Sequence, residues 1–81
     1  MEGEFESCAN IVASKHNKLK DSVKHELYKY YKQATIGDIN IDKPGIFDRV
    51  NRGKWLLWES VKGMSKGEAK ENYCRIVNEN I

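Results

Sequence analysis

Several features that mark other protein classes are scarce in this sequence of 81 residues. Its longest uninterrupted apolar run is Trp55–Trp58, far short of the roughly 20 residues that span a bilayer. The residues after Met1 are acidic and lack the basic and apolar regions of a secretory signal. The formal net charge is only +2, too small to indicate a nucleic-acid partner by itself. We therefore expect an intracellular, cytoplasmic protein with no stable insertion into a membrane.

The sequence also has few residues suited to redox, metal or catalytic chemistry. Cys8 and Cys74 are its only cysteines, and a reducing cytosol would keep them as free thiols. Together with His16 and His25 they show no paired zinc-ligand spacing, so no metal site is expected. No two acidic side chains form a convincing acid–base pair. We expect a protein that needs no cofactor and is not an enzyme.

The composition is that of one small globular domain over residues 1–81. Hydrophobic residues make up 40% and charged residues 32% of the chain, and eight aromatic residues supply material for a core. A domain of this size hides only about 60 to 65% of the surface of its unfolded chain. Any ligand is therefore expected in a surface groove rather than a sealed cavity.

Apolar residues recur at helical spacing in four segments. These predict helices over Glu4–Lys15, Ser22–Ile36 and Asn51–Lys62, and a fourth that begins with the capping box Ser65–Glu68. Asp21 is expected to cap the second helix, and Gly37 to end it. Phe5, Ala9, Val12, Tyr73 and Val77 are expected to pack the first helix on the last, with Trp55 and Trp58 mainly as core anchors. The fold class is all-α.

A long connection joins the second and third predicted helices. Residues 37–50 read GDINIDKPGIFDRV, whereas links between bundled helices usually take about two to eight residues. Its apolar side chains could pack on the helices; they are Ile39, Ile41, Ile46 and Phe47. We therefore expect an ordered crossover.

One helix face combines aromatic rings with a cation. Tyr28, Tyr31 and Lys32 stand at positions i, i+3 and i+4, and Lys54 and Tyr73 could complete the same patch. Rings stack on purines and lysines bind phosphates, which suits a nucleotide. Tyrosines at this spacing are, however, more often core residues with a hydroxyl at the surface, so the pattern alone leaves both interpretations open.

Longer motifs favour the first interpretation. The stretch YKYYKQATIGDIN at 28–40, KPG at 43–45, KWxxW at 54–58 and AxxxY at 69–73 closely resemble the acyl-CoA-binding protein family. The resemblance covers nearly the whole chain, and its long motif is far more specific than a short phosphate-loop pattern.

The resemblance implies an up-down-down-up bundle of four helices with the long crossover between helices two and three. It also implies an intracellular carrier of medium- and long-chain fatty acyl-CoA that performs no reaction. Residues matching Tyr28, Lys32 and Lys54 hold the 3'-phosphate of CoA in the family, the ring matching Tyr31 stacks on adenine, and Tyr73 lines the site. We expect a monomer, with transient contact with acyl-CoA-using enzymes or membranes.

Three positions depart from the common family pattern. Ala13 stands where many members have a phosphate-binding lysine. Lys15 lies on another face of the helix, whereas we expect the loop residue Lys18 to substitute in part. Lys24 and His25 stand where two apolar residues often flank the acyl tail. The preferred chain length therefore stays open.

Two alternatives remain at this level. A small basic helical module for protein or nucleic-acid contacts would need a continuous basic stripe, whereas the lysines here alternate with acids. The other alternative is an accessory acyl-CoA-binding domain of a larger lipid-metabolism protein.

Overall fold

The computed structural model describes residues 2–80, and within this range it contains helices and no strand. The elements are α1 (Glu2–Lys15), the short 3-10 helix η1 (His16–Lys18), α2 (Asp21–Thr35), α3 (Arg49–Glu59) and α4 (Lys66–Asn80). The predicted all-α class is confirmed. None of the described helices has the length and apolar character needed to cross a membrane.

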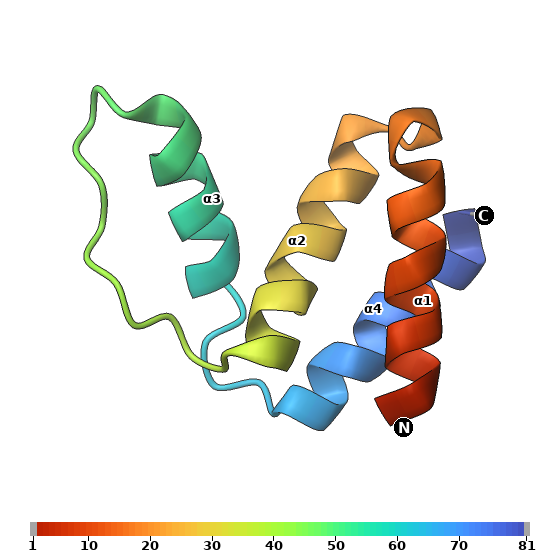
Figure 1. Ribbon diagram of the computed structural model, residues 1–81. Helices are drawn as coiled ribbons and strands as arrows, with labels where there is room; N and C mark the ends of the chain where they lie inside the picture. The colour runs from red at the N-terminus through yellow and green to blue at the C-terminus, as the bar shows by residue number, and fades with distance from the viewer. Residues whose placement is uncertain (1, 81) are drawn as a thin grey trace.

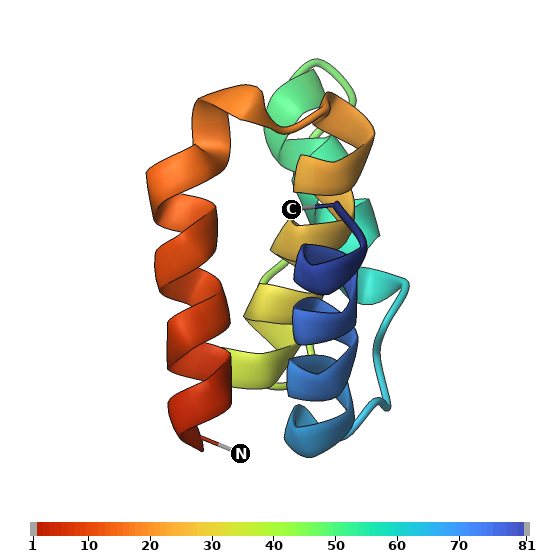
Figure 2. The same cartoon turned by 90° about the vertical axis from the view of Figure 1, so that its right-hand side faces the viewer.

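The four helices run up, down, down and up (Figure 1). Helix α2 packs against both α3 and α4, and α1 packs against α4. Figure 2 shows α1 standing to one side of α2 and α4, with the η1 turn bridging α1 to α2 at the top. The long crossover joins α2 to α3, as predicted, because two neighbouring helices that run in the same direction require a connection along their whole length.

The helix ends differ from the predicted ones by up to three residues, a common uncertainty. Helix α1 begins before Glu4, and α3 is shifted to Arg49–Glu59. Asp21 is the first residue of α2 and not its cap; Lys20 occupies the cap position without a side-chain hydrogen bond. Gly37, with φ 100°, ends α2 as expected. The Oγ of Ser65 accepts from the Glu68 N–H at 3.1 Å, which confirms the cap of α4.

The core lies between α1, α2 and α4. Its buried members come from all three helices: Phe5, Cys8, Leu27, Ala34, Ala69, Tyr73, Cys74 and Val77. Ala9 and Val12 are partly buried against this cluster. The predicted contact between the first and last helices is therefore confirmed, with Phe5, Tyr73 and Val77 at its centre.

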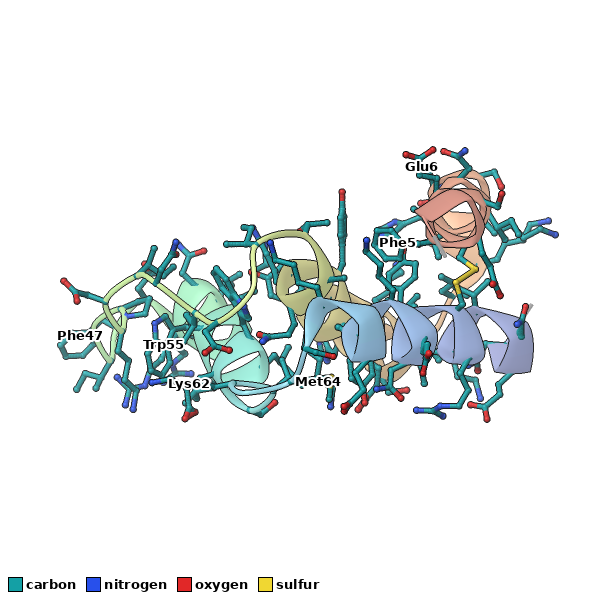
Figure 3. All side chains as sticks on the ribbon, turned by 90° about the horizontal axis from the view of Figure 1, so that it is seen from below. Phe5, Glu6, Phe47, Trp55, Lys62 and Met64 are labelled. Atoms are coloured by element: carbon teal, nitrogen blue, oxygen red, sulfur yellow. A yellow bond between two sulfur atoms is a disulfide. The ribbon has the colours of Figure 1, made fainter. Side chains whose placement is uncertain are left out.

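Cys8 and Cys74 form a disulfide between α1 and α4, so the expectation of free thiols was wrong (Figure 3). That expectation used the compartment and the lack of CxxC spacing. Neither could reveal that the two helices pack with the Cα atoms of these cysteines 5.6 Å apart, a separation that a disulfide readily bridges. The bond links positions 66 residues apart and fastens α1 to the rest of the bundle.

The crossover is ordered by side chains that donate to its backbone. The indole N–H of Trp58 donates to the Gly37 carbonyl at 2.8 Å, and that of Trp55 donates to the Ile41 carbonyl at 2.8 Å. The Arg52 guanidinium donates to the Pro44 carbonyl at 3.2 Å. Trp58 is buried as predicted, whereas Trp55 is half-buried. The crossover is thus ordered, as predicted, and the side chains that hold it in place belong to α3.

The apolar side chains of the crossover do not pack as expected. Ile39 is half-buried, but Ile41, Ile46 and Phe47 are exposed. The expectation was wrong for these three because the crossover is held through its carbonyl groups, which leaves the direction of the intervening side chains free.

Candidate functional site

A groove of about 600 Å³ opens on the face formed by α1, α2 and one residue of α4. Its walls combine small and apolar residues with a few polar ones: Ala9, Val12, Ala13, His16, Lys24, Leu27, Tyr28, Tyr31, Lys32, Thr35 and Tyr73. Four of the five predicted site residues, all except Lys54, are among them. The groove is open to solvent, which matches the expectation for so small a domain.

Tyr28 lies at the meeting point of two lysines from different helices. The Lys32 ammonium nitrogen is 5.9 Å from the centroid of the Tyr28 ring, and that of Lys54 is 5.8 Å from the same centroid. Helical spacing places Lys32 one turn from Tyr28, while the packing of α3 on α2 brings in Lys54. The structure therefore unites the predicted cationic residues at one end of the groove, where a ligand with negative charge would be attracted.

The position of Lys32 is also set by the scaffold. Its ammonium lies 5.5 Å from the centroid of the Trp58 ring, and Trp58 is buried. A cation over an aromatic face is held by the ring's negative potential. Lys32 therefore has two rings beside it, one on α2 and one on α3.

Tyr31 and Tyr73 form an aromatic cluster with Phe5. The ring centroids are 5.9 Å apart for Phe5 and Tyr31, 5.1 Å for Phe5 and Tyr73, and 6.0 Å for the two tyrosines, all in edge-to-face geometry. Tyr73 is 4% exposed and Tyr31 is 43% exposed. Tyr73 thus belongs to the core and to the groove wall, whereas Tyr31 presents ring surface on which a flat group can stack.

Two groove phenols, Tyr28 and Tyr73, have a pKa above the ordinary value of 10.0. Burial raises the pKa of Tyr73 to about 12, with a smaller contribution from Tyr31, and it also raises the pKa of Tyr28. Both hydroxyls therefore remain protonated at neutral pH. A protonated phenol can donate a hydrogen bond to an anion, which complements the two ammonium groups.

Two of the three departures from the family pattern line the groove. Ala13 and Lys24 line it, whereas His25 is exposed and is not among the lining residues. His16 lines it too, although the sequence suggested only a metal-binding role for it, which was rejected. Its position three residues after Ala13, on the same helical face, was the available signal.

The most specific motif residues build the scaffold instead. The fully buried Gln33 donates its amide to Asp38 Oδ1 at 2.8 Å and to the Met64 carbonyl at 2.7 Å. Asp38 Oδ1 also accepts from the Gly63 N–H at 2.8 Å, and these two bonds lower the pKa of its carboxyl. They tie the end of α2 to the α3–α4 link and so fix α3 beside Tyr28.

Within residues 2–80, no three His, Cys, Asp or Glu side chains gather as metal ligands do. The groove instead offers cations and neutral hydroxyls at one end, exposed ring surface beside them and an apolar floor. This arrangement suits reversible binding of an amphipathic anion.

Comparison with known proteins identifies the class of this domain. Residues 2–77 match the family model described as Acyl CoA binding protein. The Saccharomyces cerevisiae acyl-CoA-binding protein is 42% identical over 77 residues, which cover 95% of this chain and 88% of the yeast protein. Acyl-CoA-binding protein homolog 3 of Caenorhabditis elegans is 48% identical over 52 residues, 64% of this chain and 45% of that protein.

Solved structures agree. The crystal structure of Oryza sativa acyl-CoA-binding protein 2 superimposes with a TM-score of 0.89 at 37% identity, covering 96% of this chain and 87% of the rice chain. The chain belongs to the acyl-CoA-binding protein family, a family of binding proteins with this four-helix fold.

Proposed function

We propose that this chain binds medium- and long-chain fatty acyl-CoA esters and acts as an intracellular carrier that holds a pool of them. The observation that carries the proposal is the convergence of Lys32 and Lys54 on Tyr28 at one end of an open groove. Family membership supports the ligand class, and the chemistry of the groove supports the assignment of its parts.

The CoA head carries the charge that the cationic end requires. Lys32, Lys54 and the Tyr28 hydroxyl would hold the 3'-phosphate. Each ammonium at about 4 Å from a phosphate charge contributes on the order of 1 to 4 kcal/mol before desolvation, depending on the effective dielectric. The exposed face of Tyr31 would stack on adenine, with Tyr73 supporting it from the core side.

The acyl chain would lie along the apolar floor. Ala9, Val12 and Leu27 line the groove, and each buried methylene adds roughly 0.8 kcal/mol. The Lys24 stem can extend this surface while its ammonium stays in water. Both parts of the ligand are needed, so free CoA and free fatty acid should each bind far more weakly than the thioester.

The direct test is isothermal titration with palmitoyl-CoA, a medium-chain acyl-CoA, free CoA and palmitate, all below their micelle concentrations. Tight one-to-one binding of the thioesters, with weak binding of CoA and palmitate, would support the proposal. Absence of thioester binding would refute it. A dependence of affinity on acyl chain length would show how Lys24 affects the acyl-binding part of the groove.

The chain alternatively serves as the acyl-CoA-binding domain of a larger lipid-metabolism protein. Human enoyl-CoA delta isomerase 2 supports this alternative, because a match at 39% identity over 75 residues covers 93% of this chain and only 19% of that protein. Sequencing the complete transcript decides between the two, and the groove binds the same ligand in both.

We place the carrier in the cytoplasm, and the cysteine pair provides the test. The structure bridges Cys8 and Cys74, whereas disulfides persist in oxidising compartments and are rare in the cytosol, so the redox state of this pair in cells tests the location. Alkylation of acid-quenched cells followed by mass spectrometry reports their state. A fully oxidised pair would contradict the cytoplasmic location and leave the binding proposal untouched.

A further inference from the structure

The tip of the crossover presents large apolar side chains to solvent. Asp48 N–H donates to the Gly45 carbonyl at 3.0 Å, which makes Ile46 and Phe47 the central residues of a tight turn. Phe47 is 94% exposed, Ile46 65% and Val50, in the first turn of α3, 71%. Such turns usually carry glycine, proline, asparagine, aspartate or serine. Ile46, Phe47 and Val50 together are called the apolar tip.

The exposure of the apolar tip is built into the fold. The side chains of Arg52, Trp55 and Trp58 donate hydrogen bonds to carbonyl groups of the crossover. All three carbonyls lie in the part of the crossover that precedes the turn. Figure 3 shows Phe47 at the outer end of the molecule, away from Phe5 and the core. None of the three tip residues lines the groove. Clustered exposed apolar residues with a fixed position typically mark an interaction surface.

The charged residues around the apolar tip indicate which kind of partner it fits. Residues 42–52, which flank the apolar tip, contain three basic residues, Lys43, Arg49 and Arg52, and two acidic ones, Asp42 and Asp48. This segment therefore carries a formal net charge of +1. Apolar side chains that protrude beside basic ones fit the boundary between anionic headgroups and acyl chains.

We propose that the apolar tip docks this protein on anionic phospholipid bilayers, with Phe47 and Ile46 entering the interface and Arg49 and Lys43 contacting the headgroups. A protein partner fits less well, because a stable protein interface buries about 1,200 to 2,000 Å², far more than three side chains supply. A bilayer accepts a narrow, convex tip without a complementary pocket. The proposal goes beyond acyl-CoA binding and concerns a surface separate from the groove.

Vesicle flotation without any acyl-CoA tests it. The wild-type chain should float with vesicles of phosphatidylcholine and phosphatidylserine, and much less with phosphatidylcholine alone. Loss of one fully inserted phenyl ring should weaken binding roughly tenfold or more, so Phe47→Ser should remain largely unbound. Ile11→Ser removes an exposed apolar residue from α1 and should bind like wild type.

Three results would overturn the proposal: no flotation of the wild type with anionic vesicles, equal flotation of Phe47→Ser and Ile11→Ser, or equal binding to neutral and anionic vesicles. The melting temperature and the palmitoyl-CoA affinity of Phe47→Ser should match those of the wild type. Because the flotation contains no acyl-CoA, failure of vesicle binding and failure of the groove proposal are separate outcomes.

Discussion

The Lys54 ammonium on α3 lies 5.8 Å from the centroid of the Tyr28 ring on α2. This relationship joins two helices at the cationic end of the groove, and it makes Lys54 the residue whose removal tests the head-group assignment. Lys54 is exposed, so its charge is partly screened and its contribution lies toward the low end of the range for an ion pair.

Lys54→Met should weaken palmitoyl-CoA binding about tenfold, equivalent to about 1.4 kcal/mol. The melting temperature should hardly change, since most exposed substitutions shift stability by less than about 0.5 kcal/mol. Lys62→Met, which removes an exposed charge from the α3–α4 link, is the matched control for isothermal titration. Equal affinity of the two variants would remove Lys54 from the site.

Ala13→Lys should strengthen acyl-CoA binding. Ala13 is exposed on α1 and lines the groove, and lysine is nearly as good a helix former as alanine. The added ammonium should raise affinity several-fold at low salt, with the gain lost as salt screens it. Ala13→Met adds similar length without charge. A gain that is the same in both variants would show that area, not charge, is responsible.

The ionisation of Tyr73 should limit stability at high pH. Its pKa in the folded protein is about 12, raised by burial above the ordinary value of 10.0. The unfolded chain therefore loses this proton first, so the stability contribution is complete below pH 10 and is lost as pH rises toward 12. The loss amounts to at most about 2 to 3 kcal/mol.

Urea unfolding between pH 8 and pH 12, values that bracket the expected loss, measures this effect. Tyr73→Phe retains the ring that packs on Phe5 and should show a shallower decline. If the free energy of unfolding fell with pH equally in the wild type and in Tyr73→Phe, the role given to Tyr73 would be contradicted. Tyr73→Ala, by contrast, should destabilise at all pH values by about 3 to 5 kcal/mol, as is usual for a buried aromatic residue.

Reduction of the Cys8–Cys74 disulfide should lower the free energy of unfolding by about 2 to 4 kcal/mol, because the bond closes a long loop and restricts the unfolded chain. Urea titrations with and without dithiothreitol measure this. The double variant Cys8→Ala and Cys74→Ala should be insensitive to the reductant. An unchanged unfolding midpoint for the wild type on reduction would show that the bond contributes nothing.

Local signals predicted the helices well. The apolar periodicity, Gly37 after α2 and Ser65 before α4 depend only on neighbouring residues, so the sequence was sufficient for them. The grouping of Tyr28, Tyr31 and Lys32 also followed from helical spacing. Lys54 and Tyr73 were suggested as additions to the same patch, and the family resemblance then assigned them to the site. The binding roles of all five stay predictions.

Tertiary packing decided the rest. The disulfide depends on how α1 lies on α4, and the direction of Phe47 depends on which crossover carbonyls are held by α3. Asp21 was predicted to cap α2 but became its first residue, since capping depends on backbone angles that residue type only favours. His16 joined the groove because η1 continues past α1 on the side of Ala13.

Helix α3 packs outside the core that α1, α2 and α4 share. Among residues 2–80, α2 is its main helical neighbour, whereas α1, α2 and α4 share the core and the disulfide. Segments with fewer buried contacts open at lower free energy than the whole protein unfolds. Amide hydrogens of α3 should therefore exchange with solvent sooner than those of α2 and α4. Lys54 belongs to α3 and Lys32 to α2. A phosphate bound by both lysines would therefore slow amide hydrogen exchange in α3 without adding any contact to the core.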